Sequence, residues 1–273
     1  MLNLIKMDFY RLFKTKAWKT GIIVGAIFAF CASLINFGIV ELVSFASQEN
    51  PEAVMGIGMF LAVASWAGGV DFAEIVLTGT GMLSLFVSCM MAASFIGDEQ
   101  SCGYVKNIAG QFPNRGHLII SKFVTTCFVH LSILVIYTVV CSIFAGIFFN
   151  KYITGYSIGA MLAGVLLRFI LFCAINAVVL FFCTLTKSHS ISMVIGAIFG
   201  TGISSLGYKV ITMILSIAKI SVNMEMITPD GINGLINSTS IGDIALRAII
   251  VSAVFIGLFL SGAIILFKKR DVR

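Results

Sequence analysis

Hydrophobic residues occur along this chain in six long stretches, which polar segments separate. A helix needs about 20 apolar residues to cross the hydrocarbon core of a bilayer. The pattern therefore predicts an all-α membrane protein in which residues 1–273 form a single domain of six transmembrane helices. The predicted spans are Gly21–Val40, Ala73–Phe95, Phe123–Phe149, Ile158–Leu185, Ile191–Leu206 and Ile244–Phe267.

The fifth stretch is the shortest, and a second apolar piece follows it. Residues Val210–Ala218 are too few to cross a bilayer alone. We interpret this piece as a short re-entrant or interfacial segment that extends the fifth helix. It lies between the fifth and sixth spans, within an extracellular segment formed by residues 207–243.

The composition agrees with a membrane protein. Hydrophobic residues make up 59% of the chain and charged residues only 11%, whereas about a quarter of the residues are charged in an ordinary soluble domain. A chain with so few charged side chains could not cover a soluble surface.

The positive charges indicate how the chain is oriented. Of the 18 Lys and Arg residues, 13 lie in the connections on one side of the predicted membrane. They are Lys6, Arg11, Lys14, Lys16, Lys19, Lys106, Arg115, Lys122, Lys187, Lys268, Lys269, Arg270 and Arg273. Because Lys and Arg concentrate in cytoplasmic loops, we expect both termini in the cytoplasm. This bias also explains the net charge of +6, so no nucleic-acid partner is implied.

Residues 1–19 predict an amphipathic helix that lies in the membrane interface. Ile5, Phe9, Leu12 and Phe13 fall on one side at helical spacing, and the basic residues on another side would face anionic lipid headgroups. The same pattern fits two roles. The helix could serve only to fix the topology, or it could also pack against a cytoplasmic partner.

The segment between the second and third spans, residues 97–122, is the longest polar connection on the cytoplasmic side. Its acidic residues come first and its basic residues follow, which favours one or two short helices because each charge sign suits the matching end of a helix dipole. An ordinary solvated loop is the alternative interpretation.

In this segment the chain resembles permease subunits of type-two ABC exporters. The resemblance lies in Phe95-Ile96-Gly97-Asp98-Glu99, Gly103, Lys106-Asn107, Arg115 and Ser121-Lys122, and also in the first 16 residues and in Phe267–Val272. It implies a multi-pass protein of the bacterial cell membrane that pairs with a second permease subunit, the same or related. It also implies two ATPase subunits, which carry the ATP and Mg²⁺.

In that family, the segment after the second span is a coupling helix seated on the ATPase. The resemblance therefore places Glu99, Gly103, Lys106, Asn107 and Arg115 in or beside the ATPase contact. The implied cargo is an amphipathic peptide, as in permeases that export bacteriocins or phenol-soluble-modulin-like peptides or give immunity to them. The residues themselves add that G-x-x-x-x-G-K-[ST], the phosphate-binding loop, does not occur in the chain. An ATP-driven role would thus need a separate ATPase subunit, with no enzyme activity and no cofactor in this chain.

The polar residues Arg168, Glu74, Asn176 and His130 fall inside the predicted spans. Arg168 lies about ten residues into the fourth span, where a charge costs at least ~2.5 kcal/mol and needs a partner. Glu74 and Asp71 are nearest in depth. We prefer a structural ion pair to a polar element of a cargo path. For Asn176, and for His130 in the third span, we expect hydrogen bonds between helices.

Small residues predict close helix contacts at two places. Gly21-x-x-x-Gly25 and Gly196-x-x-x-Gly200 each put two glycines on one helix face. The first pair could serve a dimer of two subunits or a contact within one subunit, and we prefer the second. The three His residues are scattered, and we therefore expect no metal site.

Other functions stay open from the sequence. The cargo could instead be a lipid, a drug or an ion, and the chain could be a non-transporting anchor subunit. A secondary transporter usually has broken helices in matching halves and buried acidic residues, which the sequence does not indicate. An intramembrane enzyme is disfavoured, because H-E-x-x-H is absent.

Overall fold

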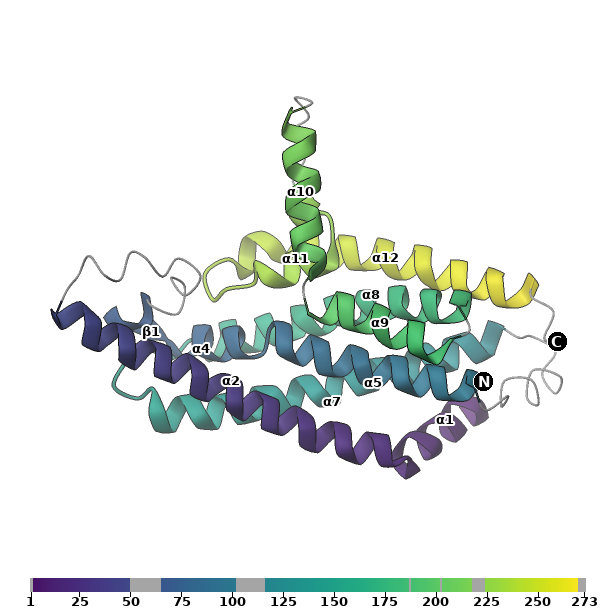
Figure 1. Ribbon diagram of the computed structural model, residues 1–273, viewed down its shortest axis with the longest axis horizontal. Coiled ribbons are helices and arrows are strands. Elements are labelled where there is room, and N and C mark those ends of the chain that lie inside the picture. Colours follow the sequence, from purple (N-terminus) through teal and green to yellow (C-terminus); the bar gives the residue numbers. More distant parts are fainter. Residues whose placement is uncertain are drawn as a thin grey trace.

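The computed structural model describes residues 2–49, 65–101, 116–186, 188–201, 203–217 and 224–269 (Figure 1). Almost all of these residues are helical. The elements are α1 (Leu2–Lys14), α2 (Lys16–Glu49), η2 (Ser65–Gly68), β1 (Val70–Asp71), α4 (Phe72–Gly79), α5 (Met82–Ser101), α7 (Gly116–Phe148), β2 (Ile153–Gly155), α8 (Ile158–Thr186), α9 (His189–Gly200), α10 (Ile203–Ile217), η3 (Met224–Met226), α11 (Pro229–Gly234) and α12 (Ile241–Lys269).

Five helical segments of the described chain are long and apolar enough to cross a membrane. They are Trp18–Phe45, Phe72–Asp98, Gly116–Phe148, Ile158–Thr186 and Ile241–Lys268. Large apolar side chains on their outer faces, such as Ile23, Ile147, Leu166 and Leu258, are more than half exposed, as suits contact with lipid. The predicted all-α, multi-pass membrane protein is thereby confirmed in outline, and the predicted number of six spans is not.

The predicted fifth span, Ile191–Leu206, is not one helix. α9 has 12 residues and ends at Gly200, and α10 begins at Ile203. At 1.5 Å per residue α9 covers only about 18 Å of a core that is about 30 Å thick. The interruption follows Gly200, where the sequence reads Gly200-Thr201-Gly202, and each glycine weakens a helix by about 1 kcal/mol relative to alanine.

α10 does not continue the direction of α9. Figure 1 shows it projecting away from the bundle, whose long axis is horizontal in that view. Its main contacts are with α9, η3 and α11 near its base. The predicted short apolar segment Val210–Ala218 thus belongs largely to a helix that stands apart from the other helices.

The second span is also interrupted, and this break was not predicted. α4 ends at Gly79 and α5 begins at Met82, so Thr80 and Gly81 form a turn inside the span. The amide of Gly81 donates to the carbonyl of Thr78 at 3.3 Å, and not to that of Leu77 as a continuous helix would require. The carbonyl of Leu77 accepts instead from the hydroxyl of Thr80 at 3.2 Å, and it can accept from a second donor.

The start of α1 and the last turns of α12 lie at the same end of the bundle (Figure 1). We call this the terminal end. At the opposite, strand end, β1 and β2 form a short parallel ladder in which the amide of Val70 donates to the carbonyl of Tyr152 at 2.9 Å. The described chain thus begins and ends at one end of the bundle, and the side of the membrane on which this end lies stays a prediction.

α8 forms the centre of the bundle. Its side chains Phe172, Ile175 and Val179 pack with Leu85 and Cys89 of α5 in the largest buried apolar cluster. In the most apolar part of α8, 61% of the residues are buried, against 11% in α12 and 22% in α2. The outer helices α2 and α12 therefore present most of their surface to lipid, and α8 supplies the internal positions.

α1 is an amphipathic helix, as predicted, and it packs partly against the protein. Leu4, Asp8 and Leu12 are its buried residues, and they repeat at a spacing of four. Phe9 and Phe13 contact the ring of Phe128 in α7, with ring centroids 5.1 and 5.8 Å apart. Of the four predicted interfacial residues, Leu12 is buried, Ile5 and Phe9 are half-buried and Phe13 is exposed.

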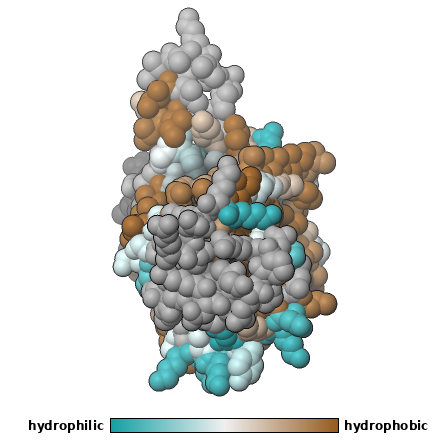
Figure 2. Space-filling model, turned by 90° about the vertical axis from the view of Figure 1, so that its right-hand side faces the viewer, coloured by the Kyte–Doolittle hydropathy of each residue, from teal (hydrophilic) through white to brown (hydrophobic). Residues whose placement is uncertain are grey.

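The terminal end carries hydrophilic residues beside α1. Figure 2 faces this end and shows hydrophilic side chains gathered along its lower edge, with hydrophobic residues on the flanks above. Lys6, Lys14, Lys16 and Lys19 of α1 and the start of α2 are all exposed. This distribution suits a helix at a membrane surface, with cationic side chains beside anionic headgroups.

A buried carboxylate fixes α1 to the bundle, and sequence reasoning missed it. Asp8 is 2% exposed, and the hydroxyl of Ser121 in α7 donates to its Oδ2 at 2.5 Å. Lys122, also buried, lies close enough to interact with the same carboxylate. We expect Asp8→Ala to release α1, because a hydrogen bond to a charged group contributes about 1.5 to 3 kcal/mol.

Limited trypsin digestion in detergent checks this expectation. Cleavage after the basic residues of α1 should become at least about tenfold faster in Asp8→Ala, since proteolysis follows the population of the released helix. Asn3→Ala is the control, because Asn3 is exposed on the same helix. Equal cleavage rates in the two variants would show that Asp8 does not hold α1.

Candidate functional site

The predicted ATPase contact lies at the terminal end, and most of it falls outside the described residues. Glu99 is in the last turns of α5, where its backbone is described and its side chain is not. Gly103, Lys106, Asn107 and Arg115 belong to the segment 102–115, which is not described. What the structure shows of the predicted coupling region, 97–122, is its two helical ends, the last turns of α5 and the first turns of α7.

The end of α5 touches the start of α9. Nε2 of His189 lies 3.2 Å from Oδ1 of Asp98 without making a hydrogen bond. A side-chain carbon added at Gly97 would lie 2.6 Å from the His189 ring. Only glycine at position 97 allows this approach. The helix that leads into the segment 102–115 is thus packed against α9, just as the helix that follows the segment is packed against α1.

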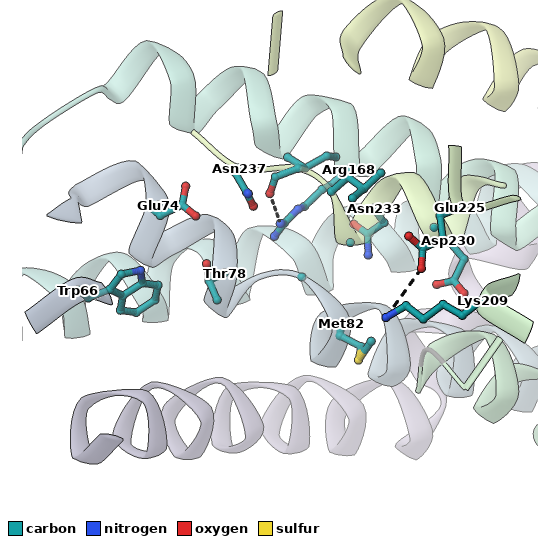
Figure 3. Close-up of a pocket in the computed structure, with 15 residues that line it drawn as sticks. Trp66, Glu74, Thr78, Met82, Arg168, Lys209, Glu225, Asp230, Asn233 and Asn237 are labelled. Carbon is teal, nitrogen blue, oxygen red and sulfur yellow. Dashed lines mark hydrogen bonds and ion pairs between the residues drawn. The ribbon is translucent and has the colours of Figure 1, made fainter. Parts of the chain in front are cut away.

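A charged cavity of about 400 Å³ lies in the other half of the bundle, nearer the strand end. It is bounded by the break between α4 and α5, by α8, by α10, η3 and α11, and by the residues that follow α11. Its charged residues are Glu74, Arg168, Lys209, Glu225 and Asp230. Figure 3 shows Glu74 and Trp66 to one side of Arg168, with Asp230, Glu225 and Lys209 to the other.

Arg168 joins three elements across this cavity. It is only 3% exposed, and its guanidinium donates to the carbonyl of Leu77, to the hydroxyl of Thr80 at 2.8 Å and to the carbonyl of Ile236 at 3.2 Å. The first two acceptors lie at the break in the second span. Arg168 therefore satisfies the carbonyl that the break frees, as backbone groups at membrane depth require.

The predicted ion pair between Arg168 and Glu74 or Asp71 is not present among the described residues. Glu74 instead accepts the amide of Ser238 at 2.7 Å, and Asp71 accepts the amide of Ser157 at 3.0 Å, just before α8 begins. Glu74 and Arg168 thus bind neighbouring peptide groups of the segment that follows α11. The prediction was wrong because the break in α4–α5 and this segment both offer backbone partners at the same depth.

An acidic cluster at the other side of the cavity connects α10 to the bundle. Asp230 of α11 is 7% exposed and accepts a hydrogen bond from the hydroxyl of Ser204 in α10. Glu225 lies 3.9 Å from the ammonium of Lys209. Burial raises the pKa of Asp230 above its ordinary value, and the hydrogen bond from Ser204 partly opposes this shift.

Asn176 and His130 make the hydrogen bonds between helices that were expected of them. The amide of Asn176 in α8 donates to the hydroxyl of Thr126 in α7 at 2.8 Å. Nδ1 of His130 in α7 lies 2.8 Å from the hydroxyl of Ser88 in α5. All four side chains are fully buried, so this cluster joins α5, α7 and α8 inside the bundle and is closed to outside molecules.

The acidic half of the cavity was not predicted. Pro229-Asp230-Gly231 has the composition of a surface turn, and Asp230 and Asn233 were therefore not singled out. In the structure Gly231 packs so closely on the backbone of Glu225 that a side-chain carbon would lie 2.3 Å from its carbonyl oxygen. This close packing buries the polar face of α11, which hydropathy alone does not reveal.

Comparison with protein-family models finds no match, and a comparison with curated proteins finds no similar sequence. The function must therefore be argued from the residues and the geometry.

Proposed function

We propose that this chain is the membrane-spanning subunit of an ATP-driven exporter, powered by a separate ATPase subunit. The observation that carries the proposal is the arrangement at the terminal end. There, the two helices that border the segment 102–115 are each packed against a further element, α5 on α9 through Gly97 and α7 on α1 through Asp8. A force applied to the segment would reach four helices at once.

In this proposal the terminal end faces the cytoplasm of a bacterial cell, and residues 97–122 bind the ATPase. Glu99, Gly103, Lys106, Asn107 and Arg115 form or flank the contact. Two ATPase subunits serve a pair of permease subunits, and ATP with Mg²⁺ is bound by the ATPase alone. ATP-driven closure of the partner would switch the spans between inward and outward access.

The charged cavity near Arg168 is a candidate binding site for the cargo. It lies among spans, is partly apolar through Trp66 and Met82, and contains hydrogen-bonding groups of both kinds. Sites of this kind, mostly apolar with a few placed polar groups, bind small ligands or parts of larger ones. An amphipathic peptide is the cargo that we propose, exported or expelled from the membrane.

Purification of the tagged chain from its native membranes tests the proposal. We expect the complex to hydrolyse ATP, and we expect the triple variant Glu99→Ala, Lys106→Ala, Arg115→Ala to lose at least nine-tenths of that activity. Loss of several charged contacts at one interface commonly costs several kcal/mol of affinity. Mass spectrometry of the complex identifies the ATPase.

The matched control is the triple variant Glu41→Ala, Lys151→Ala, Arg247→Ala, which removes the same three charges elsewhere. Glu41 and Lys151 form an exposed ion pair and Arg247 is exposed. This variant should keep the ATPase activity. A wild-type chain that purifies stably without any ATPase would overturn the proposal.

Secondary transport is a second candidate, which the structure favours more than the sequence did. The second span is broken at Thr80–Gly81, and Asp230 is a buried acidic residue. Broken helices and buried acids are typical of ion-coupled transporters. Vesicles that contain only this chain would separate the two candidates, because an imposed proton or sodium gradient should drive cargo movement only in a secondary transporter.

A further inference from the structure

The cavity beside Arg168 has an excess of negative charge. Three carboxylates line it, from Glu74, Glu225 and Asp230, against the two cations of Arg168 and Lys209. With all five groups ionised their sum is −1. Lys209 and Glu225 form a pair at 3.9 Å, so the excess lies with Asp230 and Glu74. A cavity with this balance favours a ligand that carries one positive charge.

Two buried side chains of the cavity still have unused hydrogen-bonding capacity. Oδ1 of Asn233 has no hydrogen-bond partner, although the side chain is only 4% exposed. Nε of Arg168 also has none. A buried polar atom without a partner destabilises the protein, because it has lost its hydrogen bonds to water without replacing them. A ligand that supplies a donor to Asn233 and an acceptor to Arg168 would recover part of this cost.

These acceptors lie on one short element. Asn233 and Asp230 both belong to α11, three residues apart, and Figure 3 shows Asn233 next to Arg168 and Asp230 beyond Asn233, on the side of Lys209. An ammonium group has three donors, which suit a carboxylate and an amide oxygen together. A carbonyl oxygen next to that ammonium would suit Nε of Arg168. The N-terminus of a peptide has both groups, an ammonium followed by the first carbonyl.

We propose that this cavity binds the free N-terminal ammonium group of a peptide, with Asp230 and Asn233 as acceptors and Arg168 as donor to the first carbonyl. The inference names the part of the cargo that the proposed exporter would recognise, and in that respect it rests on the proposed function. A zwitterionic aminolipid fits less well, because its phosphate cancels the positive charge that the cavity favours.

Peptide binding to the full-length chain in phosphatidylcholine nanodiscs tests the inference. The probe is a lysine-free amphipathic peptide with a C-terminal fluorophore, prepared with a free and with an acetylated N-terminus, and the readout is fluorescence anisotropy. We expect the free form to bind at least about tenfold more tightly, and we expect glycinamide to compete whereas N-acetylglycinamide does not. Equal binding of the two peptide forms would overturn the inference.

Variants locate the site. Asp230→Asn should remove the preference for the free N-terminus and leave the affinity of the acetylated peptide unchanged. Glu41→Gln is the matched control, because Glu41 is an acidic residue that faces Lys151 outside the cavity. The comparison of the two peptides on the wild-type chain keeps the test decisive even where Asp230→Asn does not fold. Nanodiscs with phosphatidylethanolamine provide the lipid arm, and competition by this lipid stronger than that by glycinamide would contradict the inference.

The pH dependence gives an independent readout. An ammonium needs the ionised carboxylate of Asp230, so binding should be lost as the pH falls through the raised pKa of that residue. Over the same range the free protein should become more stable, because burial opposes ionisation and the folded state then binds the proton more tightly. Tyr208 and Cys89 lie close enough to Asp230 to interact with its charge. The other charged groups that line the same cavity are Lys209, Glu225, Arg168 and Glu74.

The failures of the two proposals can be told apart. The binding assay contains neither ATPase nor nucleotide. A chain that prefers the free peptide but recruits no ATPase would overturn the proposed function and leave this inference standing. A chain that recruits the ATPase but shows no preference for the free N-terminus would overturn only the inference.

Discussion

Replacement of Gly200 by alanine is expected to lower the thermal stability of the protein more than any other glycine-to-alanine change in α9. A side-chain carbon at this position would lie 2.5 Å from Cα of Phe86 and 3.2 Å from its Cβ. The first of these is a backbone atom of α5, which cannot turn aside as a flexible side chain can. Forced overpacking of this kind typically costs about 1 to 3 kcal/mol.

The neighbouring glycine provides a graded comparison. At Gly196 the added carbon would lie 3.1 Å from the carbonyl oxygen of Cys89 and 3.2 Å from Cβ of Ala93. A shift of a few tenths of an ångström would relieve this contact. Gly196→Ala should therefore destabilise the protein less than Gly200→Ala.

Gly257→Ala is the control. This glycine lies in α12, and an added carbon would meet no atom of the described chain within 4 Å. Its replacement should leave stability unchanged or slightly higher, because alanine is the better helix former. The melting temperature of the purified protein in detergent checks the order. If Gly200→Ala had the same melting temperature as Gly257→Ala, then α5 and α9 would not pack as closely as the structure shows.

The glycine pairs illustrate what a sequence can reveal about helix packing. Spacing alone indicated that Gly196 and Gly200 share a helix face, and the structure places that face against α5. For Gly21 and Gly25 the preferred interpretation, a contact within one subunit, agrees with contacts to Met91 and Ile133. Spacing predicted the contact faces because small residues matter only where two helices approach closely.

Hydropathy did not reveal the break in the second span. Thr80 and Gly81 lie in a stretch that is less apolar than the other four candidate spans but still apolar enough to cross a membrane, so its average hydropathy does not indicate a break. The break persists because Arg168, which is 88 residues further along the chain, donates to the hydroxyl of Thr80 and to the carbonyl of Leu77. A partner so distant in sequence leaves no local signal.

The same reason limited the prediction of the site. Arg168 was identified because a charge at that depth is costly and therefore conspicuous in an apolar stretch. Its partners were not, because two of the three are backbone carbonyls, which every residue has. Asp230 and Asn233 were not identified, because polar residues are ordinary in a segment outside the spans. Only their burial in the fold makes them unusual.

Replacement of Arg168 by methionine should be the most destabilising polar substitution in the bundle. Methionine keeps much of the volume and removes the donors to Leu77, Thr80 and Ile236. Each buried acceptor left without a donor costs about 1 to 3 kcal/mol. The carbonyl of Ile236 and the hydroxyl oxygen of Thr80 both lose this donor, and the carbonyl of Leu77 keeps only the hydroxyl of Thr80 at 3.2 Å. We expect the combined loss to exceed the gain of about 2.5 kcal/mol from removing a charge at that depth. We expect the melting temperature in detergent to fall sharply.

Two further variants distinguish this explanation from a simple loss of charge. Arg168→Lys keeps the charge, but a compact ammonium cannot span acceptors on two elements, so it should recover only part of the stability. Arg247→Met makes the same chemical change at an exposed position of α12 and should leave stability nearly unchanged. Were Arg168→Lys as stable as the wild type, the charge rather than the geometry of the guanidinium would hold the broken span to the segment after α11. The present structure predicts the opposite, because Leu77 and Ile236 approach Arg168 from different elements and only a forked donor reaches both.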